Sequence, residues 1–118
     1  MIVYLEDVLP SGRVVYLTEG VLRLADRQPA SAALGADRLH SYLSQDASPM
    51  PAAGAVRVRI ALSPIAAVLR KGERLRISIA GADADNLERI PSSGPVSLTI
   101  ERSPNAPSFV ELPVLAKP

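Results

Sequence analysis

Two segments decide the fold class of this 118-residue chain: Val56-Arg57-Val58-Arg59-Ile60-Ala61-Leu62 and Arg74-Leu75-Arg76-Ile77-Ser78-Ile79-Ala80. In each segment aliphatic residues alternate with polar or small ones at a period of two. An extended strand places such alternate side chains on one face, which can then be buried. The pattern therefore predicts two β-strands, at residues 56–62 and 74–80, each with one dry face.

Shorter segments with extended character predict further strands. We expect a β-hairpin of residues 2–6 and 13–18, joined by a loop in which Pro10 fixes φ and Gly12 supplies a positive φ. Three more extended pieces are expected, at residues 20–24, 96–101 and 108–112.

The connections between these strands carry turn and breaker residues. Residues 25–37 are predicted to be a loop because they are rich in Ala, Ser, Gly and Pro, and residues 45–54 because two prolines cannot donate to a ladder. Residues 39–42 suit a short turn or strand, and residues 65–69 suit a helical turn or a strand. Six to eight short strands without a convincing long helix predict an all-β sandwich or jelly roll, in a single domain over residues 1–118.

Composition narrows the classes of function. The chain has 13 basic and 12 acidic residues, a net charge of +1, no cysteine and only 3% aromatic residues. We expect no nucleic-acid or membrane partner, because no strong field or aromatic platform is available. Cysteine chemistry is excluded, and we predict no cofactor. No segment resembles a signal peptide, so a cytoplasmic location is the default expectation.

A cluster of oxygen-bearing side chains lies at Asp83, Asp85, Asn86 and Glu88. Such groups could hold calcium if they converged from one short turn. The spacing disagrees with an EF-hand loop, which needs glycine at its sixth position, where Glu88 stands. The pattern favours side chains that cap a turn between strands, and we predict no metal site.

His40 is the only histidine, so any Ser-His-Asp catalysis by this chain would depend on it. No serine stands in the G-x-S-x-G turn that exposes a nucleophile. We therefore interpret His40 as a loop or packing residue, and we predict no catalytic and no cofactor-binding residue in this chain.

Arginines recur in both strong segments. If the two strands pair, Arg57 and Arg59 would share a polar face with Arg74 and Arg76, and Arg70 and Lys71 would lie near the edge. The stripe could bind an anion. We favour a solvated face or an inter-domain contact, because aromatic residues are not interleaved and acids are available to pair.

Five ordered motifs carry a family resemblance. They are Tyr4-Leu5-Glu6-Asp7-Val8, Thr18-Glu19-Gly20-Val21-Leu22-Arg23, Arg70-Lys71-Gly72-Glu73-Arg74-Leu75-Arg76, Gly81-Ala82-Asp83-Ala84-Asp85-Asn86 and Glu111-Leu112-Pro113-Val114. Together they resemble the C-terminal domain of the CocE/NonD hydrolases, which include cocaine esterase, α-amino acid ester hydrolases, glutaryl acylases and X-Pro dipeptidyl-peptidases.

The resemblance implies a jelly-roll domain of galactose-binding-like type, packed against a separate α/β-hydrolase domain and its helical cap. The Ser-His-Asp triad lies in that other domain, so the resemblance transfers no catalytic role to His40. It implies a scaffolding and cleft-lining role for this chain within a serine hydrolase.

The resemblance also suggests further strands before the Tyr4 motif, and we expect a jelly roll truncated at its N-terminus. An open sheet edge invites pairing, so we expect a dimer, a higher oligomer or strand exchange. Two other functions stay open: a free-standing carbohydrate- or ligand-binding sandwich, and a weak esterase dependent on His40.

Overall fold

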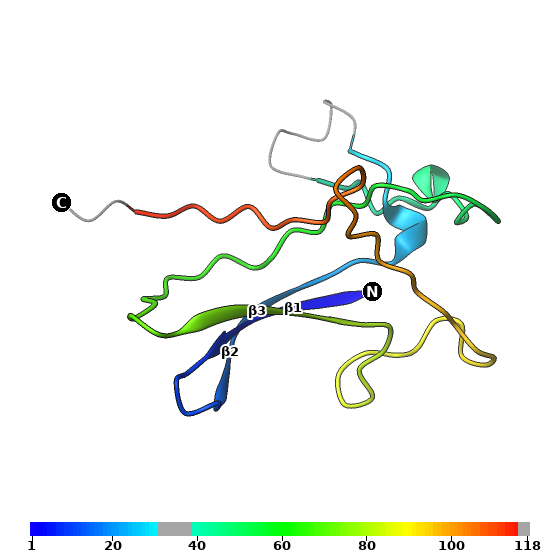
Figure 1. Cartoon of the computed structure of the whole chain (residues 1–118). Coiled ribbons are helices and arrows are strands. Elements are labelled where there is room, and N and C mark those ends of the chain that lie inside the picture. Colours follow the sequence, from blue (N-terminus) through cyan, green and yellow to red (C-terminus); the bar gives the residue numbers. More distant parts are fainter. Residues whose placement is uncertain (31–38, 116–118) are drawn as a thin grey trace.

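The structure, a computed structural model, describes residues 1–30 and 39–115 and is mostly β in character. Its strands there are β1 (Ile2–Val8), β2 (Val14–Val21) and β3 (Arg74–Ala80). Two short 3-10 turns, Leu24–Asp26 and Ser44–Asp46, are the described helical elements. The three strands form one antiparallel sheet in the order β2-β1-β3 (Figure 1).

The predicted hairpin is confirmed, and its strands are longer than expected. The Leu9 N–H donates to the Arg13 carbonyl oxygen at 2.9 Å, and Gly12 has φ of 84°, the positive value that the turn requires. One irregularity lies between Leu5, which pairs with Thr18, and Glu6, which pairs with Tyr16. This bulge gives β2 one extra residue and increases the local twist.

The sheet has two chemically distinct faces. The register pairs Val3 with Ile79, Leu5 with Ile77 and Asp7 with Leu75, so these side chains share one face. We call this the apolar face. The other face, which we call the polar face, carries the alternate pairs, which are Ile2 with Ala80, Tyr4 with Ser78, Glu6 with Arg76 and Val8 with Arg74.

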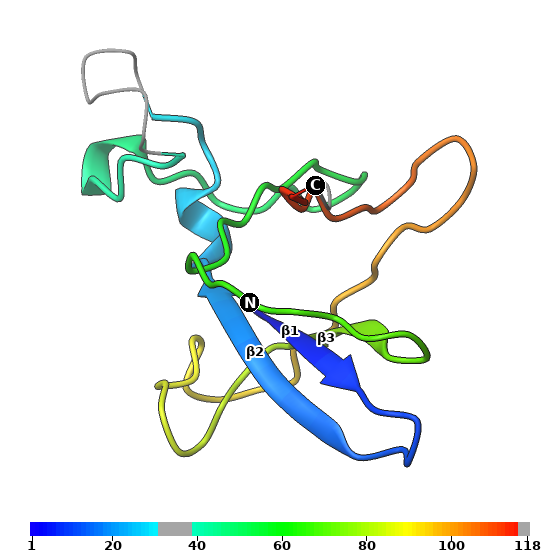
Figure 2. The same ribbon diagram turned by 90° about the vertical axis from the view of Figure 1, so that its left-hand side faces the viewer.

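Residues 56–62 do not form the predicted strand. The segment runs along one side of the sheet (Figures 1 and 2). Its alternation survives in its burial, because Val56, Val58, Ile60 and Leu62 are half-buried between exposed neighbours. It lies beside β2, where the Thr18 hydroxyl donates to the Ser63 carbonyl oxygen at 2.7 Å. The pattern therefore describes one-sided burial correctly, whereas no ladder of backbone hydrogen bonds forms.

Two other strand predictions are also wrong. Residues 96–101 and 108–112 are extended without ladder partners, and the isolated bridge between Ser103 and Ala106 lies in the loop between them. Of the predicted piece at residues 20–24, only its first two residues lie in a strand, as the end of β2. These segments lack a neighbouring strand edge at hydrogen-bonding distance, which is what converts an extended chain into sheet.

The loop predictions fare better. Residues 45–54 contain no strand, as their prolines predicted. Residues 65–69, which were expected to be a helical turn or a strand, form neither. In the segment 39–42, His40 makes a single bridge with Pro29. The predicted loop 25–37 begins with the 3-10 turn Leu24–Asp26, and its residues 31–37 lie outside the described residues.

The core of the described chain is small. Ile2, Leu5 and Leu22 are the buried hydrophobic residues, and Leu22 is the most enclosed, with 1% of its surface exposed. The chain exposes 9485 Å², whereas a compact monomer of this length would expose about 6,200 Å². Within the described residues, the second layer above the sheet is thus present as extended chain, and a closed two-sheet sandwich is not seen.

Candidate functional site

His40, the one histidine, is buried beneath the loops above the sheet. Its Nδ1 lies 3.2 Å from the Gln28 carbonyl oxygen and its Nε2 lies 2.7 Å from the Arg59 carbonyl oxygen. The ring also meets Tyr42 edge to face at 5.9 Å between centroids. Both nitrogens therefore face main-chain carbonyls, and His40 ties the 28–30 segment to the 56–62 segment as a packing residue.

The Asp-rich loop is organised around Asp83. Its carboxylate accepts hydrogen bonds from the Tyr4 hydroxyl at 2.8 Å, from the Asn86 amide at 3.0 Å and from the Asp85 N–H at 3.1 Å. The hydrogen bonds from Asn86 and Tyr4 lower the pKa of Asp83. The bond between Tyr4 and Asp83 also raises the pKa of Tyr4 to about 12. The loop caps a turn and fastens it to β1, as the sequence favoured.

No metal centre is found in the described ranges. Residues 1–30 and 39–115 contain no group of three or more His, Asp or Glu side chains placed to hold a metal ion. Asp85 and Glu88 therefore do not join Asp83 in a shared ligand set, and the Asp83 carboxylate instead accepts the hydrogen bonds of its own turn.

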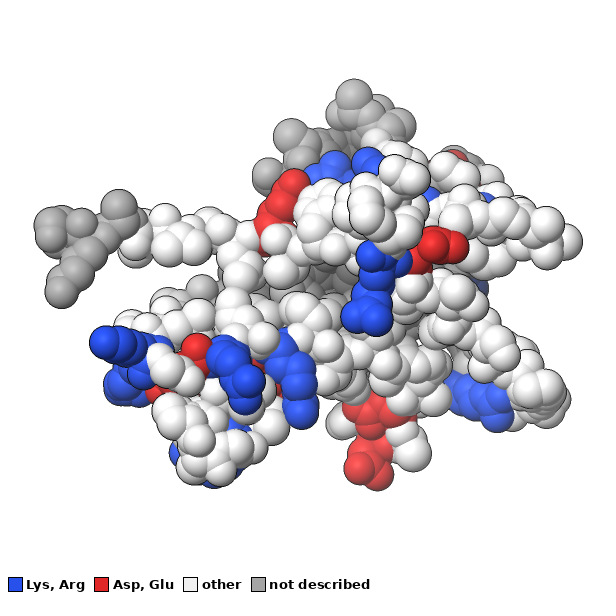
Figure 3. Space-filling model, in the orientation of Figure 1, with Lys and Arg blue, Asp and Glu red and all other residues white. Residues whose placement is uncertain are grey.

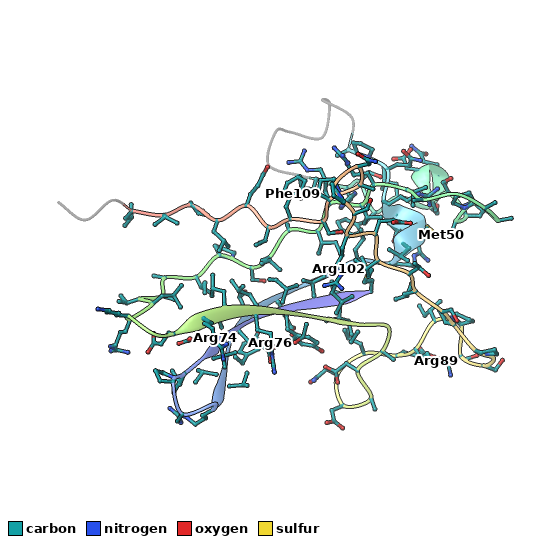
Figure 4. All side chains as sticks on the ribbon, in the orientation of Figure 1. Met50, Arg74, Arg76, Arg89, Arg102 and Phe109 are labelled. Carbon is teal, nitrogen blue, oxygen red and sulfur yellow. The ribbon has the colours of Figure 1, made fainter. Side chains whose placement is uncertain are left out.

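The arginine stripe does not form, because its condition fails: β3 pairs with β1 and residues 56–62 lie outside the sheet. Arg76 instead holds Glu6 with two hydrogen bonds, of 2.8 and 3.1 Å, and Ser78 adds a third of 2.5 Å. Arg76 and Ser78 lower the pKa of Glu6. Figure 4 shows Arg74 and Arg76 on β3, away from Arg89.

Arg57 and Arg59 line a separate hollow of about 520 Å³ together with Arg27 and His40. The Arg27 guanidinium is already hydrogen-bonded to the chain, because it donates to the Ser48 carbonyl oxygen at 2.6 Å and to the Pro49 carbonyl oxygen at 3.0 Å. On the face drawn in Figure 3, acidic and basic side chains are interspersed among uncharged ones. This distribution offers no broad anion-binding surface there.

The apolar face of the sheet is the most unusual surface of the molecule. On β3, Leu75, Ile77 and Ile79 are 38%, 40% and 43% exposed, although their partners on β1 are largely covered. A hollow of about 530 Å³ continues from Ile79 along Val96 and Leu98, with Arg89 at its rim. Contiguous exposed aliphatic surface is typical of interaction sites and binding grooves.

A buried carboxylate lies at one end of this face. Asp7 is 7% exposed, and its Oδ1 has no hydrogen-bond partner among the described residues. Burial raises the pKa of Asp7, the nearby Glu73 carboxylate raises it further, and Arg70 opposes both. The sequence placed Asp7 in the hairpin loop. Asp7 is the next alternate residue after Val3 and Leu5, so extending the period of two by one step would have placed it on the same face of the strand.

The fold and this surface define a class, a small β domain with an open apolar face. Its ionisable side chains Asp83, His40 and Arg76 each bind another segment of the same chain. This chain belongs to the family of X-Pro dipeptidyl-peptidase C-terminal non-catalytic domains, whose model matches residues 1–111.

Two curated mycobacterial proteins are similar to this chain. They carry the names "Putative serine esterase Mb1866c", from Mycobacterium bovis (strain ATCC BAA-935 / AF2122/97), and "Putative serine esterase MT1883", from Mycobacterium tuberculosis (strain CDC 1551 / Oshkosh). Each is 38% identical over 118 residues, a match that covers 96% of this chain and 18% of the relative.

The chain thus corresponds to less than a fifth of each of these proteins. No solved structure matches it. Within the described residues, no helix has the length and apolar character needed to cross a membrane.

Proposed function

We propose that this chain serves as the non-catalytic C-terminal β domain of a serine hydrolase acting on acyl esters or X-Pro peptides, where it supports the catalytic domain and lines its cleft. The observation that carries the proposal is the match of the family model to residues 1–111. The match to each curated relative covers only 18% of that protein, so the relatives contain much more chain than this domain. In that setting the domain is a jelly-roll sandwich of galactose-binding-like type, and an α/β-hydrolase domain of the same polypeptide is its partner.

The open apolar face gives this proposal a physical basis. A sheet with Leu75, Ile77 and Ile79 around 40% exposed has not buried the side chains that its alternation provides for burial. Docking against a larger domain would remove that surface from water and add favourable free energy in proportion to its area. A scaffolding role therefore uses an apolar surface that the packing of the described residues leaves incomplete.

Transfer of the domain tests the proposal. The matching region of the M. bovis relative would be deleted, and then replaced by this chain, with turnover of p-nitrophenyl acetate and thermal unfolding measured for each form. We expect deletion to lower the melting temperature and the turnover, and the chimera to recover both. A deletion protein that melts and turns over like the full-length relative would contradict a scaffolding role.

Matched variants of the chimera locate the docking surface. Leu75→Lys puts a charge on the apolar face, whereas Val68→Lys puts one at a position that is 78% exposed. We expect Leu75→Lys to reverse the recovery and Val68→Lys to preserve it.

Assay of the chain alone tests the esterase alternative. We expect p-nitrophenyl acetate turnover at the background rate, because His40 faces two carbonyl oxygens and meets no serine hydroxyl among the described residues. A rate above background that His40→Ala abolishes would establish an esterase.

A ligand-binding role is favoured by one observation: Tyr16, Tyr42 and Phe109 are 57%, 58% and 68% exposed. They come from three separate segments, namely β2, the loop after His40 and the extended C-terminal part. Glycan-array binding that is lost in Tyr16→Ala or Tyr42→Ala would support this second function.

A further inference from the structure

β3 is an edge strand whose outer side is open. It is last in the order β2-β1-β3, and every ladder bond of Arg74–Ala80 goes to β1. In the described residues, no other segment donates a backbone hydrogen bond to β3 or accepts one from it. A row of unpaired N–H and C=O groups on such an edge is a template for another strand.

β3 also lacks most of the devices that protect edges. Its seven residues contain no proline, and its register with β1 has no bulge. Two arginines lie on the polar face, but the Arg76 guanidinium is held by the Glu6 carboxylate, which offsets its charge. The edge is therefore regular and available.

We propose that β3 pairs antiparallel with β3 of a second copy of this chain, in a register centred on Ile77. Ile77 would lie opposite the partner subunit's Ile77, and Leu75 opposite the partner subunit's Ile79. The two sheets would join as one sheet of six strands. Such an interface is isologous, because the same residues contribute from both copies.

The sequence of β3 is complementary to itself in this register. On the apolar face three aliphatic pairs would stand in a row, continuing the row that already runs from β1 to β3. On the other face Arg76 would lie opposite the partner subunit's Ser78, and Arg74 opposite the partner subunit's Ala80. Directly opposed like charges are thus avoided, since each Arg76 has an uncharged residue across from it.

The occupant is a second copy because the self-paired register satisfies both the hydrogen bonds and the side chains. The residues concerned are exposed: Leu75, Ile77 and Ile79 present 38–43% of their surface. The pairing uses the edge of the sheet and does not require the hydrolase role, so either proposal can fail without the other.

Cysteine cross-linking tests the register, because the native chain has no cysteine. Residues directly opposite in an antiparallel pair have Cα atoms about 4.5–5.5 Å apart, which suits a disulfide. We expect Ile77→Cys to give a cross-linked dimer under mild oxidation. Leu75→Cys alone should not, because the two copies of residue 75 would be about 13 Å apart along the strands.

A mixture of the Leu75→Cys and Ile79→Cys variants should cross-link as a heterodimer, although neither does so alone. Val68→Cys, at a position that is 78% exposed and lies outside β3, controls for random collision. A mixture of Arg76→Cys and Ser78→Cys variants repeats the test on the polar face, without changing a core side chain, should the apolar variants fail to fold.

Light scattering on the unmodified chain completes the experiment. We expect a dimer at tens of micromolar. A monomer at that concentration would overturn the proposal and would leave the edge for a segment of a longer polypeptide. A dimer in which Leu75→Cys or Ile79→Cys cross-links alone would also overturn it, because the register would then differ.

Discussion

Residues 56–62 and residues 74–80 carry the same alternation of aliphatic and polar side chains, yet only the second segment became a strand. Burial follows the alternation in the first segment, where each aliphatic residue is half-buried and each neighbour is exposed. In β3 all three aliphatic residues remain about 40% exposed despite a complete ladder with β1. Side-chain burial and backbone pairing are thus separated in this molecule.

The comparison teaches what a period of two encodes. It states that one side of an extended chain is apolar, and it does not state which neighbour the backbone will meet. β3 pairs with the edge of β1 along its whole length. Residues 56–62 instead pass near β2, and the residue that follows them, Ser63, donates a single backbone hydrogen bond to the Glu19 carbonyl oxygen, at 2.9 Å.

Truncating one side chain in each region should give the largest contrast. Leu5→Ala removes a side chain that is 4% exposed in the central strand, and we expect a loss of about 2–5 kcal/mol in the free energy of unfolding. Ile60→Ala, in the half-buried segment, should cost less than half as much. Urea denaturation measures both, and equal losses would show that the overlying segment is as integral to the core as the sheet.

Gly20 is the point where the two regions touch most closely. A Cβ at this position would collide with the Ala61 carbonyl oxygen and the Ile60 side chain, so Gly20→Ala should push the segment away from β2 at a cost of about 1–3 kcal/mol. Faster amide exchange at Ser63 would report the separation. Gly81→Ala is the matched control, because its Cβ would meet only Leu98, at 3.7 Å.

Adjacent acids on opposite faces of β1 should respond to pH with opposite signs. The pKa of Glu6 is lowered by Arg76 and Ser78, so its contribution is present above its ordinary value of 4.5 and is lost as the pH falls through the lowered value. Glu6→Gln should therefore flatten the acid side of the stability profile.

The pKa of Asp7 is raised by burial, so the cost of its charge grows as the pH rises above its ordinary value of 3.8. Asp7→Asn should stabilise the chain at neutral pH and have little effect in acid. Thermal melts across this range measure both variants, with effects smaller than that of Leu5→Ala. Stability profiles that change with pH in the same direction for both variants would contradict the opposite pKa shifts of Glu6 and Asp7.

The smallest expected effect concerns the loop after β3. Asp83→Ala removes the acceptor of the Tyr4 hydroxyl, so the pKa of Tyr4 should fall from about 12 toward its ordinary value of 10. Ultraviolet titration of tyrosinate detects the change, and Tyr4→Phe identifies the signal. Asp85→Ala is the control, because only its backbone N–H contacts Asp83.

The sequence predicted those elements that depend on local chemistry. The hairpin follows from Pro10 and Gly12 between two extended segments, and the turn at Asp83 follows from the tendency of Asx side chains to bond the backbone two residues on. Residues 74–80 were placed within their observed bounds. These predictions required no knowledge of distant segments.

The predictions that are wrong concern features that long-range contacts decide. The pairing of β1 with β3 joins residues about seventy positions apart, and the loop residue expected at Asp7 became a buried member of β1. The arginine stripe required a strand pair that does not exist. Nothing in a period of two distinguishes these outcomes, because register depends on which edges meet.

The sequence by itself determined a mostly β chain, its family and its turns, because these depend on residue type and spacing. Only the tertiary structure decided that three strands pair in the order β2-β1-β3, that Arg76 binds Glu6, and that β3 presents an open edge beside an open apolar face. The physical reason is that a backbone hydrogen bond needs a specific partner in space, whereas apolar burial needs only exclusion from water.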